Sequence, residues 1–222
     1  MAFLLISALL YIPAFSLMTS IETYIDQYIL PQYDAFDAAH RRDHVQAVIR
    51  RSLEMAGHYP ELRTDLVLVA AAFHDIGLME GRELHHLASG RMIRSDKHLP
   101  QWFTADEIEA MAQAAEDHRA SSGRCPRSLL GMIVAEADRL IDAGTVVRRT
   151  IQYGLAHYPQ LNRQQHYERM RQHLQEKYSE QGYLKLFLPE SPNAAPLKEL
   201  QKLIHDEPQL KRMFDALFDE LS

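Results

Sequence analysis

The segment that most constrains the fold is a run of eight apolar residues, 66–73, that leads directly into His74 and Asp75. As a helix this segment would be hydrophobic on every side, and such a helix is stable only when other elements surround it. The rest of the chain offers apolar stripes at helical spacing, and it has neither an alternating strand pattern of useful length nor a hairpin signal. We therefore predict an all-α protein, in which a helix over residues 64–76 lies at the centre of a bundle.

The other expected helices are marked by start and stop signals. Thr19 and Glu22 have the spacing of a capping box for a helix that runs to about Leu30, and Thr104 and Glu107 have the same spacing further along. We expect the remaining helices over residues 34–56, 85–94, 128–142, 197–205 and 209–221, with longer polar helices after Gly144 and a linker over residues 189–196.

Composition excludes several classes of protein. Hydrophobic residues make up 46% and charged residues 24% of the chain, as in ordinary globular proteins, so wholesale disorder and a polytopic membrane protein are excluded. The formal net charge of −6 argues against a broad basic surface for nucleic acid. The single cysteine, Cys125, can form neither an internal disulfide nor a cysteine-ligated zinc site, which favours a reducing cytoplasm. Any metal site must therefore be built from carboxylates and the 12 histidines.

Residues 1–17 form an uncharged, largely apolar segment that needs separate treatment. The segment lacks the Lys or Arg that precedes the apolar part of a signal peptide, and it is shorter than the ~20 apolar residues that span a bilayer. Our interpretation is that translation starts at Met18 and that this segment is not part of the protein; the alternative is an uncleaved membrane anchor. We divide the rest of the chain into a bundle at residues 18–144 and a helical extension at residues 145–222 that covers the bundle.

Four residues that can bind metal fall at inward or terminal positions of separate predicted helices: His44, His74, Asp75 and Asp138. Burying two carboxylates in an apolar bundle without partners is strongly unfavourable, so the set requires a cation. Two imidazoles and two carboxylates suit Mn²⁺, Fe²⁺, Zn²⁺ or Mg²⁺ and leave positions for water and substrate oxygens. The sequence therefore predicts a divalent metal site.

His44, the segment Phe73-His74-Asp75-Ile76-Gly77 and the segment Ala137-Asp138-Arg139-Leu140 together resemble the HD-domain metal-dependent phosphohydrolases, over about residues 36–144. The resemblance implies a helical bundle around one or two divalent ions that hydrolyses phosphate esters, often of nucleotides. It also implies that His44, His74, Asp75 and Asp138 are metal ligands. Asp75 is the predicted catalytic residue, because it is best placed to accept a proton while it holds the metal.

Two further features resemble family members with two metal ions. The segment His86-Leu87-Ala88-Ser89-Gly90 is similar to a histidine-containing helix start in those members, and His118 lies where they place another histidine. Asp75 would then bridge the two ions. His85 is the alternative to His86, because a shift of one residue still aligns Ser89 and Met92 tolerably.

The expected partner is a small phosphorylated compound, a nucleotide by resemblance. Arginine presents paired donors to phosphate oxygens, and the candidates are Arg139 and Arg119, followed by Arg41 and Arg42. The lysine that many family members carry soon after the His-Asp-Ile-Gly stretch is absent, and so is the Gly-Tyr-Pro signature of the cyclic-dinucleotide branch. Specificity is expected to depend on a pocket roof built by the helices after Gly144.

Two other functions stay open. Some HD-fold proteins with a fuller set of histidines hold two irons and perform oxygenation, and His86 and His118 keep a di-iron oxygenase as the alternative. In a third, non-enzymatic interpretation a metal only staples the bundle, and the tyrosine-rich later helices bind a partner. An open coordination position would distinguish an enzyme from such a module.

Overall fold

A computed structural model describes residues 20–37 and 40–222 of the chain. The predictions for residues 1–17, for Met18 and for Thr19 lie outside the described residues. The first described helix, α1, spans Ile21–Tyr24, and its N-cap is Ser20, whose hydroxyl accepts the backbone N–H of Thr23 at 3.3 Å. The N-cap therefore lies one residue after the predicted one, Thr19, because the hydroxyl of Ser20 makes the capping bond.

The predicted start of the helix over residues 34–56 is wrong. After α1 the chain stays helical through a π-helix, Ile25–Ile29, and a 3-10 helix, Leu30–Ala35, and becomes extended at Phe36. Helix α2 then spans Arg42–Ala56 instead of beginning near residue 34. The reason is local, since Pro31 fits the first turn of the short 3-10 helix and the chain breaks where that helix ends.

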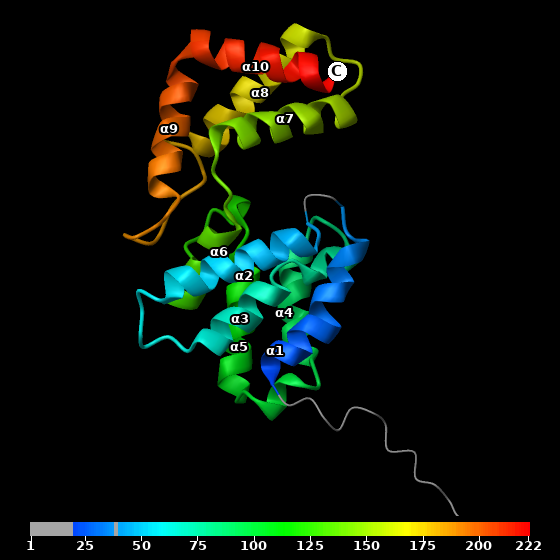
Figure 1. Cartoon of the computed structure of the whole chain (residues 1–222), viewed down its shortest axis with the longest axis vertical. Helices are drawn as coiled ribbons and strands as arrows, with labels where there is room; N and C mark the ends of the chain where they lie inside the picture. Colours follow the sequence, from blue (N-terminus) through cyan, green and yellow to red (C-terminus); the bar gives the residue numbers. More distant parts are fainter. Residues whose placement is uncertain (1–19, 38–39) are drawn as a thin grey trace, which may run out of the picture.

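Helix α3, Thr64–Phe73, lies at the centre of the bundle, as its all-round apolar sequence predicts (Figure 1). Its side chains from Val69 to Phe73 are almost completely buried, together with Val67. The bundle around it also contains η4 (Ile76–Glu80), α4 (His85–Ser95), η5 (Leu99–Gln101), α5 (Ala105–Asp117), η6 (Ala120–Ser122) and α6 (Leu129–Asp138). No strand occurs among the described residues, so the all-α prediction is confirmed.

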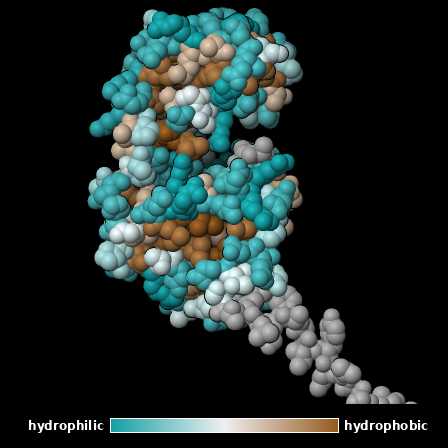
Figure 2. Space-filling view, in the orientation of Figure 1, coloured by the Kyte–Doolittle hydropathy of each residue, from teal (hydrophilic) through white to brown (hydrophobic). Residues whose placement is uncertain are grey.

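The C-terminal part of the chain forms a second layer with a core of its own. Its helices are α7 (Ala143–His157), α8 (Arg163–Tyr178), α9 (Ala194–His205) and α10 (Glu207–Leu221). Met170, Leu174 and Phe214 lie fully buried in this second hydrophobic cluster, which begins at Ile141. Figure 1 shows these helices stacked on one end of the bundle, and Figure 2 shows hydrophobic residues gathered within each part with a hydrophilic band between them. Within residues 20–37 and 40–222, no helix combines the length and apolar character needed to cross a membrane.

The end of α6 joins the two parts. The buried Glu136 carboxylate accepts the backbone N–H groups of Phe187 and Leu188, the latter at 2.7 Å. Arg139 donates from Nη1 to the carbonyl of Lys185, and its guanidinium lies 4.9 Å from the centroid of the Phe187 ring. These contacts lie on either side of Asp138 in the sequence, so the helix that carries Asp138 is fixed to the segment that returns from the extension.

Candidate metal centre

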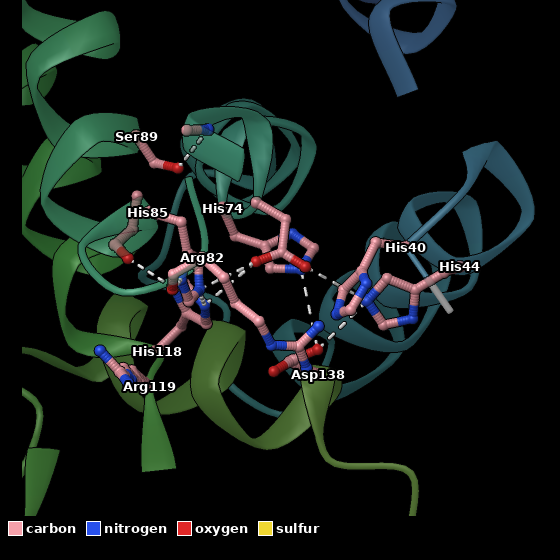
Figure 3. Close-up of polar contacts among 12 residues, drawn as sticks. His40, His44, His74, Arg82, His85, Ser89, His118, Arg119 and Asp138 are labelled. Carbon is pink, nitrogen blue, oxygen red and sulfur yellow. Dashed lines mark hydrogen bonds and ion pairs between the residues drawn. The ribbon is translucent and has the colours of Figure 1, made fainter. Parts of the chain in front are cut away.

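His44, His74, Asp75 and Asp138 converge beside a cavity that residues of the extension also line. Figure 3 shows His44, His74 and Asp138 turned toward one another. One ligand atom from each lies within 4.8 Å of the corresponding atoms of the other three. Nε2 of His44 is 3.2 Å from Oδ1 of Asp138, and Nε2 of His74 is 3.3 Å from Oδ2 of Asp75. The structure therefore brings together the four residues that the sequence pattern selected, and this group could hold a metal ion.

A second group lies on the other side of Asp75. Oδ1 of Asp75 is 3.3 Å from Nε2 of His85 and 3.4 Å from Nε2 of His118. Asp75 thus presents Oδ2 to the first group and Oδ1 to the second, which is the arrangement of a bridging carboxylate. The predicted bridging position of Asp75 agrees with this geometry.

The hydrogen bonds of the histidines fix which nitrogen faces the centre. Nδ1 of His74, His85 and His118 each lies 2.6–2.7 Å from a backbone carbonyl three residues earlier. A carbonyl oxygen can only accept, so each Nδ1 carries a proton and each Nε2 is the nitrogen that faces the carboxylates, where it can bind a cation, either a second proton or a metal ion. Nε2 of His85 and Nε2 of His118 are only 3.1 Å apart, and two lone pairs at that distance repel each other unless a cation lies between them. This donor set fits a divalent metal.

Unpaired buried nitrogens support the same conclusion. Nε2 of His44 and Nε2 of His74 are buried and have no partner in hydrogen-bond geometry among the described residues, although carboxylate oxygens lie 3.2–3.7 Å away. Buried polar atoms normally have partners, so unpaired ring nitrogens that face carboxylate oxygens in this way fit the ligand set of a metal ion.

Charge within the two groups shifts the pKa values of their members. Burial raises the pKa of Asp75, but His74, His118 and His85 hold it well below its usual range. Burial lowers the pKa of His74, but Asp75 and Asp138 raise it well above its ordinary value. The carboxylates are therefore ionised at neutral pH and attract positive charge, as a proton or as a divalent cation.

The close approach of α4 to the turn after Asp75 brings His85 into place. The backbone N–H of Gly77 donates to Oγ of the buried Ser89 at 2.9 Å. A Cβ at Gly77 would lie 2.1 Å from the carbonyl oxygen of His85, so only glycine lets the start of α4 pack this closely. The first residue of α4 therefore reaches Asp75.

The preference for His86 over His85 is wrong in the structure. His86 belongs to neither group of converging ligand atoms, whereas His85 does. The physical reason is helix periodicity, because Ser89 faces the turn at Gly77 and the residue one full turn earlier on the same face is His85. The pairing of Ser89 with Gly77 is the signal that would have selected it, but only the structure shows that pairing.

The arginines predicted for phosphate binding separate into two kinds. Arg139 is buried at the end of α6, where its contacts with Lys185 and Phe187 hold it away from the centre, so its predicted role is wrong. Arg41 donates to the carbonyl of Phe36 at 3.4 Å and Arg42 to the carboxylate of Asp34 at 2.6 Å, and neither lines the cavity at the site. Arg119 does line that cavity and donates from Nη1 to the carbonyl of Glu83.

An open cavity of about 580 Å³ lies over the two groups. One wall comes from the bundle and includes Asp75, Asp138 and the histidines His40, His44, His85 and His118. The other comes from the extension and consists of Arg149, Gln152, Tyr153, Lys177 and Tyr183. Sequence reasoning predicted a roof from this part of the chain but none of its residues, because the packing of two separate cores decides which side chains meet the site.

Comparison with known protein families identifies part of this architecture. The family model for the HD domain matches residues 41–142, a range that contains every member of both ligand groups. The range ends at the N-cap of α7, so the roof lies outside it. Neither the curated proteins nor the solved structures contain a significant match to the chain.

Proposed function

Since residues 41–142 match the HD-domain family, we propose that the chain is a metal-dependent phosphohydrolase that acts on a nucleotide-like phosphomonoester or phosphoanhydride. The observation that carries this proposal is Asp75, whose two carboxylate oxygens each face a separate group of histidine ligands. Such a bridge suits a pair of divalent ions, with His44, His74, Asp75 and Asp138 for one and Asp75, His85 and His118 for the other.

The residues of the centre divide the chemical work. Divalent cations bound there would lower the pKa of a water molecule and neutralise charge on the phosphoryl oxygens. Asp75, ionised at neutral pH, contacts histidines of both groups and is the proposed acceptor of the proton from the attacking water. The backbone carbonyls that accept from the Nδ1 atoms orient the imidazoles before substrate binds.

Arg119 is the proposed phosphate-binding residue of the bundle wall. It lies next to His118 and lines the cavity. Only one of its guanidinium nitrogens is used by the carbonyl of Glu83, which leaves donors for a phosphoryl oxygen.

The open cavity favours an enzyme over a bundle that is merely stapled by metal. His44, Asp75, Asp138, His85 and His118 all line it, so bound ions would be accessible to a small ligand. The exposed, unpaired Cys125 supports our proposal that the protein works in a reducing compartment, the cytoplasm.

The test combines metal analysis with a phosphate-release assay. Protein purified without oxygen should contain up to two equivalents of Mn, Fe, Mg or Zn, and with Mn²⁺ it should release phosphate or pyrophosphate from at least one member of a panel of nucleotides and phosphomonoesters. A chelator should abolish the release, and added Mn²⁺ should restore it. A metal-loaded protein that releases nothing from the whole panel would count against a phosphohydrolase.

A di-iron oxygenase is the second candidate, because the group of Asp75, His85 and His118 provides the additional histidine ligands that this chemistry needs. This candidate predicts two iron equivalents and oxygen consumption with a phosphonate or polyol. Oxygen consumption without phosphate release would favour it over hydrolysis.

A further inference from the structure

The cavity at the metal centre is strongly unbalanced in charge. Its lining contains two carboxylates, Asp75 and Asp138, and both belong to the proposed metal ligands. Four side chains with a fixed positive charge line it as well: Arg82, Arg119, Arg149 and Lys177. Arg82 already lies 3.8 Å from a carboxylate oxygen of Asp37. Bound divalent ions would offset Asp75 and Asp138, so the other three cations in the lining are left to pair with the ligand.

Arg149 differs from its neighbour in the sequence. Arg148 donates both terminal nitrogens to the carboxylate of Glu220 at 2.7 Å, as an ordinary surface arginine does. Arg149 turns to the cavity and has no carboxylate within 4.0 Å among residues 20–37 and 40–222. An arginine left unpaired beside a pocket is available to bind an anion.

Lys177 lies on the same roof and also lacks an acidic partner in the described part of the chain. Its Nζ is 5.1 Å from the centroid of the Tyr178 ring. Lys177 lines the same cavity as Asp75 and Asp138, so this cation of the roof faces the metal centre across that cavity.

We propose that Arg149 and Lys177 bind a second anionic group of the substrate, a phosphate or a carboxylate that is not cleaved. The metal centre and Arg119 hold the reacting phosphoryl group, so this inference rests on the proposed function. A substrate whose remaining part is neutral would leave two cations facing it without partners. A substrate that carries the second anion satisfies them, so these two residues determine specificity.

Alkylene bisphosphonates test this proposal without turnover, because their C–P bonds are not hydrolysed. The dissociation constants of propylphosphonate and of methylene, propylene and pentylene bisphosphonate are measured by calorimetry with Mn²⁺-loaded full-length protein under anaerobic conditions. At least one bisphosphonate should bind about tenfold more tightly than the monophosphonate, since a hydrogen bond to a charged group contributes this much or more.

The variants assign that gain to the roof. Arg149→Gln with Lys177→Gln should remove it and leave the affinity for propylphosphonate within about twofold. The pair Lys198→Gln with Arg212→Gln is the matched control, because it removes the same charge from exposed positions of the extension outside the cavity. This control should bind all four compounds as the wild type does.

Three results would overturn the proposal: no gain at any length, a gain that survives in the roof variant, or an equal loss of monophosphonate and bisphosphonate binding in that variant. Failure of the proposed function looks different. In that case the gain and its loss in the roof variant persist, while no member of the nucleotide and phosphomonoester panel releases phosphate.

Discussion

The variant Asp75→Asn keeps the shape of the side chain but removes its negative charge and replaces one oxygen with an NH₂ group. In the structure each oxygen of Asp75 serves a different group of histidines. After the substitution the first group keeps His44, His74 and Asp138, whereas the second keeps only His85 and His118. Three protein ligands are enough for a catalytic metal and two are not, so bound Mn²⁺ should fall from two equivalents to one.

The same change removes the proposed proton acceptor. Loss of an acid-base group together with a shared ligand should lower the rate of phosphate release by at least ~10² to 10³-fold, or about 2.7–4 kcal/mol of transition-state stabilisation. Metal content is measured by mass spectrometry after gel filtration, and kcat/KM with the best substrate of the panel. Asp43→Asn is the control, because it makes the same chemical change at an exposed position of α2, next to His44 but outside the cavity. An Asp75→Asn protein with two metal equivalents and wild-type turnover would refute both the bridge and the mechanism.

Three further predictions address the positioning of the site. His85→Ala should remove one equivalent of bound Mn²⁺ and His86→Ala should not, because only His85 faces Asp75; equal losses in both variants would contradict this assignment. Binding of Mn²⁺ at pH 7 should release at least one proton, because the raised pKa of His74 keeps this histidine protonated until the metal displaces the proton. The affinity for Mn²⁺ should therefore weaken as the pH falls. Calorimetry in buffers of different ionisation enthalpy counts the released protons, and a count of zero would contradict this prediction. Gly77→Ala should destabilise the protein by about 3 kcal/mol, or roughly 6–12 °C in Tm, because its Cβ would meet a backbone carbonyl at 2.1 Å, whereas Gly144→Ala, whose nearest atom would be 3.6 Å away, should melt within a few degrees of the wild type.

Much of the bundle could be predicted from local sequence patterns. The start of α5 is confirmed, since Thr104 and Glu107 form the capping box that their spacing indicates. Helix boundaries were predicted less well where a helix ends because of a contact that is distant in the sequence, since such a contact leaves no mark in the hydrophobic periodicity. Helix α6 ends at Asp138, four residues earlier than expected, because Arg139 adopts an extended conformation that lets it bond to the returning chain at Lys185. That partner is distant in the sequence, so no local pattern could indicate it.

For the metal centre, too, some features follow from the sequence and others depend on tertiary contacts. By itself the sequence determined that the chain is helical and that His44, His74, Asp75 and Asp138 converge, because helical periodicity and the cost of burying charge depend only on the order of residues. Only the tertiary structure decided between His85 and His86, because the rotation of α4 is set by its contact with Gly77 and not by its own sequence. It also decided that Arg149 and Lys177 face the centre, because the position of the roof depends on how two separately buried cores pack against each other.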